Sequence, residues 1–94
     1  MTTLADIRDQ IDDLDDRVIE LLKERLDLVI STLEKKDRIE DLKREDQIVA
    51  KLKKNSGNED EEEYLKEIYK VIFKEGKRIQ NMKNIRKQNE QEKL

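Results

Sequence analysis

The fold is decided by residues 4–33, which read LADIRDQIDDLDDRVIELLKERLDLVISTL. Apolar residues recur in this stretch at alternating steps of three and four, the spacing that places them on one face of an α-helix. Thr2 or Thr3 is a suitable N-cap, and Asp6 puts a negative charge in the first turn. The pattern predicts a first helix over residues 4–36, with a stripe made of Leu4, Ile7, Ile11, Leu14, Val18, Leu21, Leu28, Val29 and Leu33.

A helix of this length cannot bury its apolar stripe within one small chain. At about 1.5 Å per residue it spans about 50 Å. A compact domain of 94 residues has a radius of gyration of only about 13 Å. The stripe therefore predicts that a second chain covers it.

Two further helices follow, so we expect one domain over residues 1–94. The second helix is predicted over residues 41–54, and the sequence Asn-Ser-Gly-Asn at residues 55–58 ends it. An acidic run then starts a third helix, predicted over residues 59–86. Apolar residues become rare after Lys83, and we expect residues 87–94 to form a frayed tail.

The composition supports an all-α protein and excludes several kinds of chemistry. Apolar residues make up 34% of the chain and charged residues 48%, with no proline, as in long helices. Because cysteine and histidine are both absent, the chain has no disulfide, no thiolate nucleophile and none of the usual zinc ligands. We expect no metal and no cofactor, and any catalysis must rely on Arg, Lys, Gln and carboxylates.

The charge pattern gives no sign of a nucleic-acid or membrane partner. The net charge is −3, from 21 basic and 24 acidic side chains mixed along the chain. A basic group near the end of the third helix fits a solvated helix surface, and comprises Lys77, Arg78, Lys83, Arg86 and Lys87. Apolar runs such as residues 28–30 are far too short to span a bilayer. A soluble, cytoplasmic protein is expected.

Polar residues interrupt every apolar stripe. In the first helix the intruders are Arg8, Arg25 and Lys36, on or beside the face that should be packed; in the second they are Asp41 and Glu45; in the third, Gly76 and Gln80. Unpaired buried charge is costly, so these groups must pair with one another or with a ligand. Interhelical salt bridges that fix the register explain them as well as a polar ligand pocket does.

The first helix closely resembles that of the all-α chorismate mutases. The resemblance is carried by Ile-Arg at 7–8, Ile-Asp-Asp-Leu-Asp at 11–15, Leu-Leu-Lys-Glu-Arg at 21–25, and Lys36. The second helix resembles the family's Asp-x-x-Arg-Glu motif through Asp41, Arg44 and Glu45, and Gln80 stands where the family keeps Gln or Glu. The resemblance covers about residues 4–82.

This resemblance implies an intertwined homodimer of three-helix chains that converts chorismate to prephenate on the route to phenylalanine and tyrosine. That rearrangement needs no nucleophile or metal. By the resemblance, Lys36 and Gln80 donate to the ether oxygen that gains negative charge, and Arg25 binds the substrate carboxylates together with Arg8 of the other subunit. Asp41 or Glu45 accepts a hydrogen bond from the ring hydroxyl. The implied substrate-binding set is completed by Arg44, which orders that end of the site.

Two departures from the family leave alternatives open. The connection between Lys36 and Asp41 is shorter than is usual in the family by about one helical turn. Gly76 replaces a small hydroxyl residue that touches the substrate, a loss of about 0.5–1.5 kcal/mol if one hydrogen bond disappears. The alternatives are an isochorismate pyruvate-lyase on the same scaffold and a non-catalytic or engineered helical dimer that retains the motif.

Overall fold

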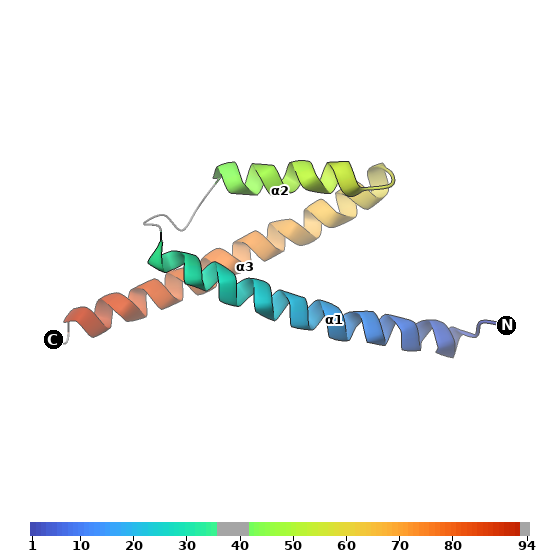
Figure 1. Cartoon of the computed structure of the whole chain (residues 1–94), viewed down its shortest axis with the longest axis horizontal. Helices are drawn as coiled ribbons and strands as arrows, with labels where there is room; N and C mark the ends of the chain where they lie inside the picture. Colours follow the sequence, from blue (N-terminus) through green and yellow to red (C-terminus); the bar gives the residue numbers. More distant parts are fainter. Residues whose placement is uncertain (36–41, 93–94) are drawn as a thin grey trace.

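The computed structural model describes residues 1–35 and 42–92, with side chains described as far as residue 86. These ranges are all-α, as predicted. They contain α1 (Leu4–Ser31), the 3₁₀ turn η1 (Thr32–Glu34), α2 (Leu42–Asn55) and α3 (Glu59–Glu92). In Figure 1, α2 and α3 form an antiparallel hairpin and α1 crosses α3. Among the described residues, α3 is the central element, since it packs against both α1 and α2.

The start of α1 is fixed by a capping box. The Thr3 hydroxyl accepts a hydrogen bond from the Asp6 amide (3.1 Å), and the Asp6 carboxylate accepts one from the Thr3 amide (3.0 Å). These two bonds satisfy amides that have no partner within the helix. The expectation that Thr2 or Thr3 caps the helix is confirmed for Thr3.

The end of α1 differs from the prediction, because the α-helix stops at Ser31 rather than continuing to residue 36. Two hydroxyl side chains bond back to carbonyls of the last turn: Ser31 Oγ to Asp27 O (2.9 Å) and Thr32 Oγ1 to Val29 O (2.6 Å). Such local bonds compete with the helical pattern, and the chain tightens into a 3₁₀ turn. Lys36 and Asp41 lie outside the described residues.

The α2–α3 turn follows the prediction closely. Ser56 and Asn55 donate to the carbonyls of Leu52 (2.6 Å) and Lys51 (2.8 Å), which closes the end of α2. The Asn58 side chain then accepts from the Glu61 amide (2.8 Å) and caps α3, whose first turn is acidic.

At its other end α3 continues to Glu92. The prediction that a frayed tail begins at residue 87 is therefore wrong for residues 87–92. Residues 87–92 include no apolar residue, but they consist largely of Lys, Gln and Glu, which favour helix without tertiary contacts.

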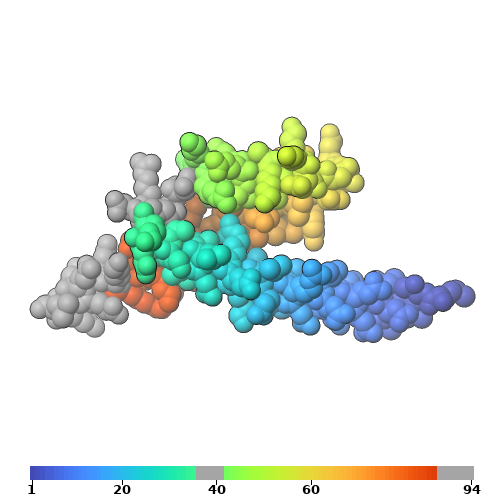
Figure 2. Space-filling model, in the orientation of Figure 1, coloured from blue at the N-terminus to red at the C-terminus, as the bar shows by residue number. Residues whose placement is uncertain are grey.

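Most of the apolar stripe of α1 is left uncovered by the described part of the chain. No residue of α1 is buried, and Leu14 in the middle of the stripe is 53% exposed. Figure 2 shows the blue N-terminal half of α1 standing clear of the other helices. The molecule measures 66 × 28 × 16 Å, with a radius of gyration of 17.6 Å, well above that of a compact domain of this length.

None of the helices in the described part of the chain combines the length and apolar character of a bilayer-spanning segment.

The capping box yields a prediction about stability and pH. Thr3→Ala removes the acceptor for the Asp6 amide and should lower the free energy of unfolding by about 1 kcal/mol, measured by urea titration followed by circular dichroism. Thr2→Ala, one residue outside the box, is the matched control.

The hydrogen bonds from Thr3, with its backbone amide as the main donor, lower the pKa of Asp6 below its ordinary value of 3.8. The stabilisation from this carboxylate is therefore fully present above about pH 3.8 and is lost as the pH falls through the lowered pKa. Asp6→Asn should show a smaller loss of stability on acidification through this range than the parent. An equal loss in both proteins would contradict the assignment.

Candidate active site

A small pocket lined by both apolar and charged residues lies where α1 crosses α3 beside α2. Its volume is about 80 Å³, and it is lined by Arg25, Val29, Arg44, Glu45, Ile48, Ile72, Phe73, Gly76, Lys77 and Gln80. We call this the inner pocket. It therefore brings together Arg25, Arg44, Glu45 and Gln80, four of the seven residues that the sequence analysis assigned to a site. They come from three different helices.

The inner pocket lies between two larger hollows. On one side is the α1–α2 cleft of about 770 Å³, which shares Arg25, Val29, Arg44 and Ile48 with it. On the other side is the α2–α3 groove of about 760 Å³, which shares Glu45, Phe73 and Lys77. Small-molecule sites usually measure about 300–1,000 Å³, so a ligand held by the inner pocket must also occupy one of these hollows.

Arg25 lies over two aromatic rings of α3. Its guanidinium carbon is 5.9 Å from the ring centroids of both Tyr69 and Phe73, and these two rings pack against each other at 5.7 Å. Cation–π contacts of this kind hold a guanidinium in place without using its N–H donors. The rings therefore do not use the N–H donors of Arg25. A guanidinium can bind a carboxylate through two parallel hydrogen bonds.

Gln80 is the most buried polar residue of the described chain, with 2% of its surface exposed. Its Nε2 donates to the Val29 carbonyl (2.8 Å) and to the Thr32 hydroxyl (3.2 Å), so it ties α3 to the end of α1. Gln80, which interrupts the apolar stripe of α3, is therefore a buried side chain whose amide is hydrogen-bonded. If Nε2 of Gln80 donates to a ligand, it exchanges the longer of its two hydrogen bonds, the one to Thr32, for a bond to that ligand.

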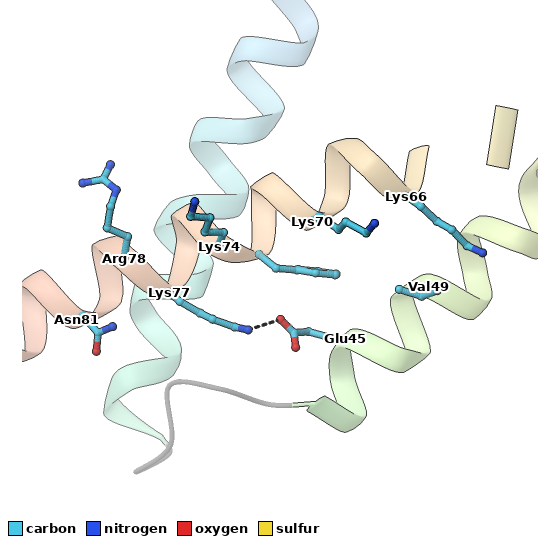
Figure 3. A pocket seen from close by; sticks show the side chains of 9 residues that line it. Glu45, Val49, Lys66, Lys70, Lys74, Lys77, Arg78 and Asn81 are labelled. Carbon is cyan, nitrogen blue, oxygen red and sulfur yellow. Dashed lines mark ion pairs between the residues drawn. The ribbon is translucent and has the colours of Figure 1, made fainter. Parts of the chain in front are cut away.

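Glu45 and Arg44 bring opposite charges to the pocket from α2. Glu45 Oε1 is 2.8 Å from Lys77 Nζ, and Arg44 Nη1 donates to Gln47 Oε1 at 3.3 Å. The side chains of Glu45 and Lys77 are 19% and 30% exposed, so this ion pair is half-buried. Figure 3 shows the lysine reaching from α3 to the carboxylate on α2.

Gly76 is buried on α3 opposite Val29. A Cβ added there would lie 3.7 Å from Val29 Cγ1, an ordinary van der Waals distance. The backbone at Gly76 does not adopt a positive φ. A small side chain would therefore fit at this position, and the glycine is not required by the helix crossing.

Of the other three predicted site residues, the structure describes only Arg8. Arg8 is exposed and belongs to the N-terminal half of α1, which runs away from α2 and α3 (Figure 1) and does not line the inner pocket. Lys36 and Asp41 fall outside the described residues, so their predicted roles stay predictions.

Two residues of the site were missed by sequence reasoning. Lys77 was interpreted as part of a solvated helix surface, which is wrong, since it forms the half-buried ion pair with Glu45. Thr32 anchors the Gln80 amide. The periodicity of apolar residues identifies neither of them, because Lys77 is one of many lysines on its helix and Thr32 lies at a helix end. Their partners lie far away in the sequence.

The fold and this pocket define a class of protein: an all-α chain with a small site at a helix crossing, where cations and an amide face a single carboxylate. Such a site suits a small anionic ligand that carries a hydroxyl.

The chain belongs to the chorismate mutase type II family, whose sequence profile matches residues 7–81. It is thus an isomerase of the chorismate mutase class, and the family implies chorismate as its substrate. The resemblance drawn from the helix motifs is confirmed. No curated protein matches the chain, and no solved structure does either.

The hydrogen bonds of Gln80 predict a structural effect that is independent of catalysis. Gln80→Leu keeps the approximate volume but removes the donor to the Val29 carbonyl and the Thr32 hydroxyl, and should lower the free energy of unfolding by about 0.5–1.5 kcal/mol. Asn81→Leu, at the exposed neighbouring position, is the control. Equal urea midpoints for both variants would show that Gln80 does not hold the crossing.

Proposed function

We propose that this protein converts chorismate to prephenate by holding the substrate in its compact conformer and stabilising the breaking ether oxygen. The observation that carries the proposal is the inner pocket, where Arg25, Arg44 and Gln80 converge with one carboxylate. The rearrangement is intramolecular, so correct positioning and electrostatic stabilisation can supply the acceleration without a general base. A chain that lacks histidine and cysteine has the means for such a reaction.

Each group has a proposed role that follows from its chemistry. Arg25 binds a substrate carboxylate, with its guanidinium held by the Tyr69 and Phe73 rings. Lys36 and Gln80 donate to the ether oxygen as negative charge develops there. Glu45 or Asp41 accepts a hydrogen bond from the ring hydroxyl. Arg44 orders this end of the site from the first turns of α2.

The second copy of the chain is part of the proposal, because of the distance between Arg8 and Arg25. Along one helix these residues are on the order of 25 Å apart, too far to bind the same small molecule. If both arginines act on the substrate, Arg8 must come from a second copy. A second copy would also cover the stripe of α1 that is exposed in the single chain.

Turnover is tested by following the loss of chorismate by ultraviolet absorbance and identifying prephenate as the product. Lys36→Ala should lower kcat by about 10²–10³, the usual cost of removing one donor to a developing oxyanion. Lys35→Ala, the adjacent lysine, is the matched control. Near-normal turnover by Lys36→Ala would refute its role, and release of pyruvate from isochorismate by the parent, without mutase turnover, would favour the lyase alternative.

Arg8 is tested by mixing two inactive variants. Arg8→Ala and Arg25→Ala should each be severely impaired alone. If a site takes Arg8 from one chain and Arg25 from the other, a mixed dimer has one site with both substitutions and one with neither.

Unfolding and refolding an equal mixture of the two variants should therefore restore roughly a quarter of the parental sites. Size-exclusion chromatography with light scattering establishes the mass of the species. The absence of recovery, from a folded dimer, would place both arginines in the same chain's site or outside the site.

A further inference from the structure

The ion pair between Lys77 and Glu45 has an unusual place in the molecule. It joins α3 to α2, whereas the other ion pairs shown by the described residues link positions one turn apart on α3. Both of its members line the inner pocket, and both also line the α2–α3 groove. The pair thus stands at the boundary between the two spaces.

The remaining cations of the α2–α3 groove do not build an anion site there. Lys66 pairs with Glu62 (2.9 Å), Lys70 with Glu67 (2.7 Å) and Arg78 with Glu75 (2.5 Å), each within α3. In Figure 3 the side chains of Lys74 and Arg78 do not point toward Glu45, whereas that of Lys77 does. Lys77 is the groove cation whose charge is directed at the inner pocket.

A carboxylate in the inner pocket presents an electrostatic problem for the proposed ligand. A dicarboxylate brings two further negative charges close to Glu45, in a half-buried place where screening by water is reduced. The cation of Lys77 offsets the charge of Glu45. The Lys77 ammonium lies 2.8 Å from Oε1 of Glu45, and a carboxylate has a second oxygen that can accept another hydrogen bond.

We propose that Lys77 is a positioning residue for substrate recognition. It holds the Glu45 carboxylate through Oε1 so that Oε2 accepts the hydrogen bond of the substrate's ring hydroxyl, and it lowers the repulsion between this carboxylate and the anionic substrate. The inference rests on the proposed function and deepens it, because it selects Glu45 as the hydroxyl acceptor and adds a residue that the family motif does not include.

The test measures kcat and KM for chorismate in Lys77→Met, Lys77→Arg and Lys70→Met. Lys77→Met should raise KM roughly tenfold, the effect of losing one charge-assisted hydrogen bond, with little change in kcat, because the interaction exists in the ground state as well as the transition state. Lys77→Arg keeps the charge and should keep KM within a few-fold of the parent. Lys70→Met removes a cation from the same helix, and should leave both constants unchanged.

Two further measurements separate positioning from a structural effect. In a Glu45→Gln background, Lys77→Met should add little to the rise in KM, since the carboxylate that it holds is gone. With a substrate analogue in which hydrogen replaces the ring hydroxyl, Lys77→Met should weaken binding much less than it does for chorismate, because only the repulsion between Glu45 and the anionic analogue is then left uncompensated. Urea midpoints and circular dichroism establish that the variants are folded.

The outcomes are distinguishable. An unchanged KM in folded Lys77→Met would overturn the role of Lys77 while the proposed function stands. A rise in KM that persists in the Glu45→Gln background, or an effect on binding that is undiminished with the analogue that lacks the hydroxyl, would also overturn it, because Lys77 would then act on the substrate carboxylates or on the fold. If the parent itself does not convert chorismate, the proposed function fails, and the role of Lys77 fails with it.

Discussion

The length of α1 is the constraint on which the rest of the structure depends. Its C-terminal part crosses α3, but its N-terminal half carries Leu4, Ile7, Ile11 and Leu14 with roughly half of their surface exposed. Burial of apolar surface contributes about 25 cal/mol of favourable free energy for each Å² removed from water. A stripe of this size is a strong driving force for association, because the N-terminal half of α1 diverges from the hairpin of α2 and α3 (Figure 1).

The crossing of α1 and α3 gives the site its shape. Gln80 connects the helices through the Val29 carbonyl and the Thr32 hydroxyl at the point where α1 tightens into η1. The Val29 carbonyl lies in the last turn of α1 and also accepts from the Thr32 hydroxyl (2.6 Å), so the contact ties α3 to the point where the α-helix ends. The same crossing places Arg25 over the rings of α3. The stability of the fold and the geometry of the pocket thus share the same few contacts, and one residue, Gln80, has to serve both.

Sequence reasoning was successful where local chemistry decides and incomplete where tertiary contacts decide. The cap at Thr3 and the break at residues 55–58 follow from side chains that bond to nearby backbone, and both are found in the structure. Gln80, a polar residue within the apolar stripe of the third helix, was predicted to lie on the packed face, and it is buried in the structure. The partner of Lys77 could not be predicted, because its lysine neighbours on α3 have the same local pattern, and only the placement of α2 brings Glu45 within 2.8 Å of it. The extension of α3 to Glu92 was missed because apolar content was given more weight than helix propensity.

The size of the inner pocket links the proposed dimerisation to the proposed catalysis. The inner pocket of about 80 Å³ can hold only part of a ligand, and the adjoining α1–α2 cleft of about 770 Å³ is open on the side of Leu28, which is 69% exposed. Electrostatic stabilisation is strong only where water is excluded. An apolar helix laid along α1 would cover Leu28 and narrow the cleft, and the first turns of a second α1 would bring Arg8 with it. In the dimer that we propose, the association that buries the stripe therefore also closes the site, and a single chain would have the catalytic groups without the dry environment in which they act.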